Sequence, residues 1–101
     1  MSKLGLHISD EVYHDLEFVF QYGIETFGIL TTEKYLEKIH RKINELAEMP
    51  SKGQHHKNLP IEIKFILIES HMILYKYSTT QKIVYILRIM HKNMDIGNVD
   101  L

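Results

Sequence analysis

Cysteine is absent from this chain of 101 residues, which excludes disulfide bonds, thiolate zinc sites and cysteine nucleophiles. No run of about 18 uncharged apolar residues is present to span a membrane, and the first residues lack the apolar core of a signal peptide. We therefore expect a soluble protein with no membrane as partner, and the absence of cysteine is compatible with a reducing cytoplasm. The apolar content of 45% suits one ordinary globular domain over residues 1–101.

An excess of either charge is also lacking, because the chain has 12 Lys and Arg residues and 13 Asp and Glu residues. Residues 1–50 carry five basic and nine acidic side chains, and residues 51–101 carry seven and four, so the halves differ only as −4 and +3. Domains that bind nucleic acid directly are usually strongly basic, so we expect no such binding. Five basic side chains in the second half form either a small basic patch or a solvated loop. They are Lys52, His55, His56, Lys57 and Lys64.

The spacing of apolar residues in the first half predicts a strand followed by two helices. Alternation over residues 4–8 is typical of a short half-buried strand. Ser9 is a good N-cap for a helix whose apolar stripe begins at Val12, and Gly28 is well placed to end it. Thr31 or Thr32 can cap a second helix, which ends at residue 49 because proline follows.

The second half predicts a polar loop over residues 51–60 and then three strands at residues 61–68, 71–77 and 83–90. The expected class is α+β with the order β-α-α-β-β-β. In this arrangement an antiparallel helical hairpin packs on one face of a small curved, mainly antiparallel sheet.

The last strand is apolar on both of its faces and contains an arginine. Strict alternation divides it into Ile83, Tyr85, Leu87 and Ile89 on one face and Val84, Ile86, Arg88 and Met90 on the other. A buried arginine needs a partner or an opening to water. Because two helices can cover only one face, we expect the other face to be apolar and to bind another protein.

Motifs of the common catalytic classes are missing. No serine is flanked by glycines as in a nucleophile elbow, and no glycine-rich phosphate loop occurs. None of the seven histidines has the helical spacing that zinc hydrolases use, so we expect no metal ion and no other cofactor. One acid–base cluster remains, in which lysine or histidine moves a proton from a ribose hydroxyl and arginine stabilises a phosphate, unless its members are merely sheet-surface residues. It consists of Lys64, His71, Arg88 and His91.

Six short segments follow one another in an order that is specific when they are taken together. They are Phe27-Gly28, Tyr35-Leu36, Leu46 to Pro50, Gly53, His71 to Tyr75 and Arg88 to Asp95. With the order of elements, these segments resemble the ParE branch of the RelE/ParE toxin superfamily, small bacterial toxins that are paired with a cognate antitoxin. The resemblance covers nearly the whole chain, and its most specific part is the final Arg-x-x-His-x-x-Met-Asp.

The resemblance implies a ParD-like antitoxin whose C-terminal part wraps the toxin, and poisoning of DNA gyrase without enzymatic activity. The residues we expect to bind the target or partner are Arg88, His91, Lys92, Met94 and Asp95. Asp95 has two alternative structural roles, which are to pair with Arg88 or to cap the end of the strand.

Two alternatives to gyrase poisoning follow from the same resemblance. RelE-like members are ribosome-dependent mRNA endonucleases, for which Lys64, His71, Arg88 and His91 would be catalytic. In a branch that uses histidines, the corresponding residues would be His55, His71 and His91. Lys64 departs from the family pattern, since many relatives carry arginine at this position. The other alternative is an inactive toxin fold that serves only as a scaffold for antitoxin binding.

Overall fold

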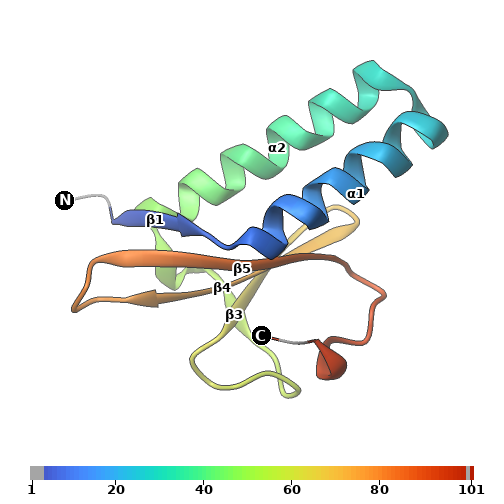
Figure 1. The fold of residues 1–101 in the computed structure, drawn as a ribbon. Coiled ribbons are helices and arrows are strands. Elements are labelled where there is room, and N and C mark those ends of the chain that lie inside the picture. Colours follow the sequence, from blue (N-terminus) through green and yellow to red (C-terminus); the bar gives the residue numbers. More distant parts are fainter. Residues whose placement is uncertain (1–3, 100) are drawn as a thin grey trace.

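The computed structural model describes residues 4–99 and 101, and it consists of a helical hairpin laid on a sheet (Figure 1). In chain order the elements are β1 (Gly5–Ile8), α1 (Asp10–Phe27), α2 (Ile29–Glu48), the 3-10 turn η1 (Pro50–Lys52), β2 (Gln54–His55), β3 (Lys64–Ile68), β4 (His71–Ser78), β5 (Ile83–His91) and the 3-10 turn η2 (Ile96–Asn98). The predicted α+β class is confirmed. Neither of the two helices in this part of the chain is long and apolar enough to cross a membrane.

The sheet has five strands in the order β1-β5-β4-β3-β2, with β1 parallel to β5 and the other pairs antiparallel. The short strand β2 was not predicted, because it lies inside the polar segment that we assigned to a loop. β3 begins at Lys64 instead of residue 61. The reason is that Ile63 leaves the sheet and is buried in a cluster on the face away from the helices.

The turn between the helices is shorter than predicted. Gly28 has a positive φ of 86°, which reverses the chain within one residue at little steric cost, so α2 begins at Ile29 and not after Thr31 or Thr32. Thr32 still satisfies the turn, because its hydroxyl donates to the Gly28 carbonyl oxygen at 2.8 Å.

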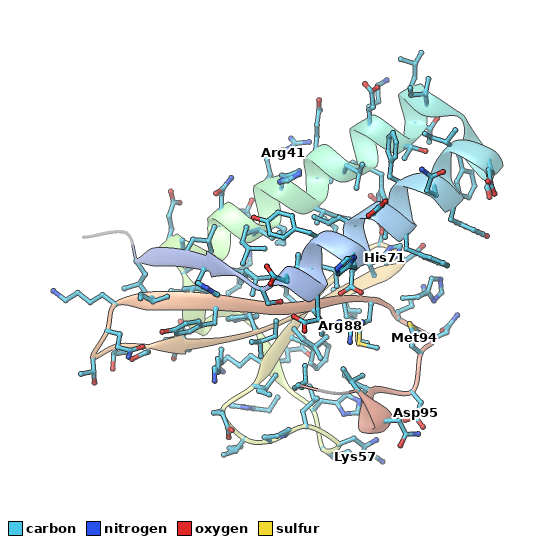
Figure 2. All side chains as sticks on the ribbon, in the orientation of Figure 1. Arg41, Lys57, His71, Arg88, Met94 and Asp95 are labelled. Atoms are coloured by element: carbon cyan, nitrogen blue, oxygen red, sulfur yellow. The ribbon has the colours of Figure 1, made fainter. Side chains whose placement is uncertain are left out.

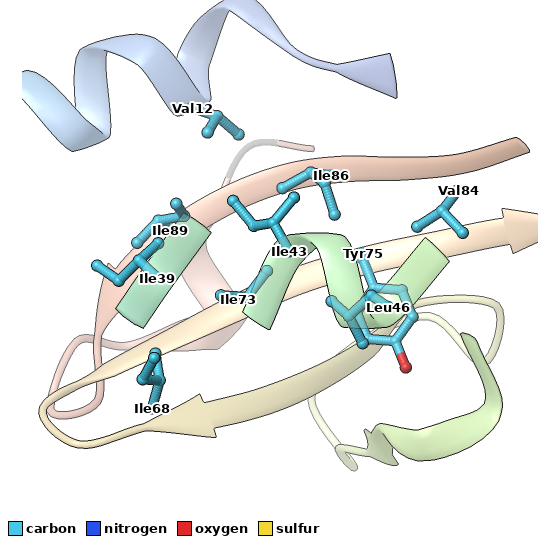
Figure 3. Close-up of a cluster of buried hydrophobic side chains, with 10 residues drawn as sticks. All are labelled: Val12, Ile39, Ile43, Leu46, Ile68, Ile73, Tyr75, Val84, Ile86 and Ile89. Carbon is cyan, nitrogen blue, oxygen red and sulfur yellow. The ribbon is translucent and has the colours of Figure 1, made fainter. Parts of the chain in front are cut away.

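The main core lies between the hairpin and the sheet (Figure 3). Both helices and the inner strands supply it, and ten buried side chains form its centre. They are Val12, Ile39, Ile43, Leu46, Ile68, Ile73, Tyr75, Val84, Ile86 and Ile89.

The opposite face of the sheet is apolar as expected, but the chain itself covers part of it with a second, smaller core, so this face is not left open to a partner as we predicted. Met72, Leu74 and Met90 on the strands pack with Ile63 from the long loop and Ile96 from η2. Partly buried side chains at residues 59, 65, 87 and 99 complete this cluster. The chain covers much of its own far face with segments that carry too little periodicity to reveal their position.

The two faces of β5 also differ from strict alternation. Ile89 joins Val84 and Ile86 in the main core, whereas Met90 packs on the far face near Leu87. The cause is a register shift in the β4–β5 ladder, which pairs Tyr75 with Ile86 but pairs the preceding residue of β4 with Arg88. One extra residue in β5 therefore exchanges the faces of all residues after it.

Candidate functional site

Arg88 lies on the part of β5 that extends past β1, next to α1. Its Nε and Nη2 donate to the two carboxylate oxygens of Asp15, each at 2.9 Å, and the Ile89 N–H donates to the same carboxylate at 2.9 Å. The side chains of Arg88 and Asp15 are 24% and 13% exposed. A bidentate ion pair that is largely removed from water holds the guanidinium in one orientation.

Asp15 was not among the predicted site residues, although the sequence contains a signal for it. It stands three residues after Val12 and four before Val19, both of which are buried on the inner side of α1. A carboxylate on the apolar stripe of a helix needs a partner. The arginine inside the apolar strand was the matching half of that signal.

Two histidines and a tyrosine form a second polar group beside the Arg88 pair. His71 and His91 are direct partners in the β4–β5 ladder, with ring centroids 5.5 Å apart. The Tyr35 hydroxyl lies 2.6 Å from His71 Nδ1, and it donates to the Ile68 carbonyl oxygen at 3.0 Å. Burial, with a smaller contribution from neighbouring His91, lowers the pKa of His71, and burial raises the pKa of Tyr35. His71 is thus held in its neutral form more firmly than an exposed histidine.

Both polar groups line a groove of about 1010 Å³ between the helical hairpin and the end of the sheet. We call it the hairpin groove. It contains four predicted site residues, His71, Arg88, His91 and Met94. Figure 2 labels three of them, His71, Arg88 and Met94, and shows them at the same end of the sheet. Its apolar lining includes several side chains that are largely exposed to water, namely Phe18, Tyr22 and Phe27 together with Met94.

Three of the predicted site residues, Lys64, Lys92 and Asp95, lie outside this groove. Lys64 is on β3, two strands from β5, where its ammonium lies 3.3 Å from His55 Nε2. Lys92 is exposed just after β5, and its backbone N–H donates to the Ser70 carbonyl oxygen at 2.8 Å. The acid–base cluster that we predicted from the sequence is therefore not assembled as a unit.

Asp95 does not pair with Arg88, so that interpretation is wrong. It is the N-cap of η2, where its carboxylate accepts from the Gly97 N–H at 3.0 Å and from Asn98 Nδ2 at 2.7 Å. Asp15 reaches Arg88 first because α1 lies directly beside that part of β5, whereas the turn after β5 carries Asp95 away from it.

The histidines do not form a metal centre in residues 4–99 and 101, where no group of three or more His, Asp or Glu side chains could hold an ion. The basic side chains around the long loop are divided. His55 is next to Lys64, whereas His56 packs edge-on against Phe65 at 5.7 Å between ring centroids. His56 therefore packs against the sheet, whereas His55 is exposed.

Solved toxin–antitoxin structures have the same fold. The chain resembles the chromosomal ParDE toxin–antitoxin system from P. aeruginosa with a TM-score of 0.75, 15% identity, and coverage of 88% of this chain and 96% of that one. It resembles the toxin–antitoxin complex RelBE2 from Mycobacterium tuberculosis with a TM-score of 0.62, 14% identity, and coverage of 90% and 100%. These two likenesses show the fold that the chain shares with them, a helical hairpin packed on a mixed five-stranded sheet.

Comparison of the sequence identifies the family more specifically than comparison of the fold does. Residues 6–96 match the family described as the ParE toxin of type II toxin–antitoxin systems, parDE. Toxin ParE1 of Caulobacter vibrioides is 26% identical over 81 residues, which are 80% of this chain and 81% of that protein. The chain belongs to the ParE toxin family, and the resemblance inferred from its motifs is confirmed.

Proposed function

We propose that this protein, as the toxin of a type II module in the bacterial cytoplasm, inhibits DNA gyrase without being an enzyme. We further propose that a ParD-like antitoxin neutralises it. The family membership and the similarity to Toxin ParE1 support the first part, and the similarity to a ParDE toxin–antitoxin system supports the second.

The observation that carries the proposal is the engagement of Arg88 by Asp15. Cleavage of RNA needs a proton acceptor and a cation within reach of one ribose and its phosphate. Here the guanidinium is neutralised by a carboxylate, and Lys64 lies two strands away. Such an arrangement favours recognition of a protein surface over stabilisation of a phosphate.

A ribosome-dependent mRNA endonuclease is the second candidate, and one observation favours it. His71 and His91 lie close together in the hairpin groove that Arg88 also lines. Displacement of Asp15 by an RNA phosphate would bring a cation and two imidazoles into one site. Catalysis in this case would depend on the histidines.

Two assays run side by side distinguish these candidates. We expect the purified toxin to inhibit supercoiling by purified gyrase and to leave ribosome-bound mRNA intact. The reverse result would replace the leading proposal with the endonuclease. Inactivity in both assays, with no arrest of growth on expression, would indicate a scaffold that only binds its antitoxin.

The contribution of the site is measured with arginine variants. Substitution of Arg88→Ala is expected to abolish gyrase inhibition and growth arrest, and Arg88→Lys is expected to retain little of either because lysine cannot make the two-pronged contact. The control is Arg41→Ala on the exposed side of α2, which removes the only other arginine of the chain. Full toxicity of a folded Arg88→Ala variant would remove Arg88 from the site.

The antitoxin is proposed to cover the hairpin groove and the apolar residues near the tip of the hairpin, with an added helix or edge strand. Phe18 and Leu30 are 74% and 72% exposed in the isolated chain. Exposed apolar side chains of this size are typical of surfaces that bind another protein.

A further inference from the structure

A second hollow, of about 490 Å³, lies at the other end of the sheet from the hairpin groove. Figure 1 places the β4–β5 turn, which borders it, at the opposite end of the sheet from the end of β5. Three of its residues form one row across three neighbouring strands, with His7 of β1 beside Tyr85 of β5 and Tyr85 beside Lys76 of β4. We call it the β-turn hollow.

The row faces away from the helices. Tyr85 stands between Val84 and Ile86, which are both in the main core, so alternation directs Tyr85 to the opposite face. The His7 ring centroid is 5.6 Å from that of Tyr85, and Lys76 Nζ is 5.7 Å from the Tyr85 centroid. The hollow therefore combines two aromatic rings with an ammonium group.

The hydrogen bonds within the hollow use side-chain acceptors and leave several side-chain donors for a ligand. The Tyr85 hydroxyl donates to Gln81 Oε1 at 2.5 Å, so the two N–H groups of the Gln81 amide remain for another acceptor. The Gln81 backbone N–H donates to Ser78 Oγ at 3.0 Å, which leaves the Ser78 hydroxyl hydrogen to donate in turn.

The charge of the hollow is positive. None of its lining residues is Asp or Glu, and among the described residues Lys76 makes no ion pair within 4.0 Å. A set of donors with a cation and no carboxylate favours an anion.

We propose that the β-turn hollow binds the phosphate of a nucleotide, free or within a single strand, with the base against His7 and Tyr85. Donors from three side chains suit the several oxygens of a phosphate, and aromatic rings stack with any base. A carboxylate ligand would use the donors and leave the rings unused. This proposal does not depend on gyrase inhibition, because the hollow shares no lining residue with the hairpin groove.

The test is an NMR titration of the full-length, ¹⁵N-labelled chain with thymidine 5′-monophosphate, thymidine, inorganic phosphate and a short oligothymidylate. We expect saturable shifts of the backbone amides of Lys76, Gln81 and Tyr85 with the monophosphate. Weaker shifts are expected with inorganic phosphate and none with thymidine. Tighter, more salt-sensitive binding of the oligothymidylate would identify a strand as the ligand, and equal binding would identify a free nucleotide.

Variants locate the binding. Lys76→Ala is expected to weaken binding of the monophosphate about tenfold, through loss of one charge-assisted hydrogen bond. Lys76→Glu should abolish binding and Lys76→Arg should retain it. The matched control is Lys57→Glu in the exposed long loop, which reverses the same charge elsewhere.

Three results would each overturn the proposal. One is the absence of saturable shifts at these amides, and another is unchanged binding by folded Lys76→Glu. The third is equal binding of N-acetylglutamate, which would show that any carboxylate satisfies the donors.

Discussion

Single residues determine the chemistry of the hairpin groove, and Asp15 is one that joins α1 to β5. Its carboxylate accepts three hydrogen bonds, two from the Arg88 guanidinium and one from the Ile89 N–H. The same contact satisfies a backbone group beyond the end of β1, whose pairing with β5 stops at Ile8 and Ile86. Asp15 therefore supports both the site and the edge of the sheet.

Substitution of Asp15→Ala is expected to lower the free energy of unfolding by about 2–4 kcal/mol, because a largely buried guanidinium loses its carboxylate. Urea denaturation measures this. Glu17→Ala, at an exposed position of the same helix, is the control and should change stability by less than about 0.5 kcal/mol. Equal effects of the two substitutions would contradict a stabilising role for the pair.

His71 gives stability a dependence on pH. Its pKa lies below the ordinary 6.5 because burial and neighbouring His91 disfavour the imidazolium. The unfolded chain therefore binds a proton at a higher pH than the folded chain, and stability falls as the pH drops below about 7. His71→Asn should make the unfolding free energy depend less on pH between about 7.5 and 5.5.

The control for this pH effect is His40→Asn, which removes an exposed histidine of α2. It should leave the pH dependence as in the original chain. A His71→Asn variant with the same slope as the His40→Asn variant would show that another group causes the acid destabilisation.

At the scale of elements, Gly23 explains how closely the two helices of the hairpin approach. Glycine inside a helix ordinarily weakens it. In the structure an added Cβ at Gly23 would lie 2.6 Å from Thr32 Oγ1 and 2.7 Å from Thr32 Cγ2. The close packing of α1 on α2 therefore requires glycine at this position. The residue that it contacts, Thr32, was predicted from the sequence only as a helix cap.

Substitution of Gly23→Ala is expected to destabilise the protein by about 1–2 kcal/mol, although alanine is the better helix former by about 1 kcal/mol. Thermal or urea unfolding measures the change. Adding Thr32→Ala should restore part of the loss, because it removes the two closest atoms. A Gly23→Ala variant that is more stable than the original chain would contradict the close approach.

The observed helices and strands also show which elements the periodicity of apolar residues can predict and which it cannot. It identified both helices and four strands, because each has an apolar stripe or alternation that a core requires. It could not identify β2, which has only two residues and pairs through its backbone. It also misassigned Ile89 and Met90, since a register shift between two strands leaves no mark on the sequence of one.

For the whole molecule, the important feature is that the chain builds a core on each face of its sheet. Ile96 of η2 is only 6% exposed and packs in the far-face cluster with Met72, Leu74 and Met90. The turn η2 thus covers part of the sheet face that we had expected a partner protein to cover. The surface that we propose for the antitoxin is the hairpin groove, with the apolar side chains beside it.

Removal of the Ile96 side chain is expected to destabilise the whole fold. Ile96→Ala should cost about 2–4 kcal/mol, through lost burial and the cavity left behind. Leu101→Ala, at a residue 49% exposed, is the control and should cost less than about 0.5 kcal/mol. An Ile96→Ala variant as stable as the Leu101→Ala variant would mean that the far face does not need this cover.

By itself, the sequence determined the class of fold, the order of its main elements and the family, because these depend on periodicity and on short segments in a fixed order. The tertiary structure alone decided that Arg88 pairs with Asp15, that His71 meets Tyr35 and His91, and that Lys64 lies apart from them. The physical reason is that periodicity reports burial along one element. Which side chains meet depends on strand register and helix position, and contacts between distant segments fix both.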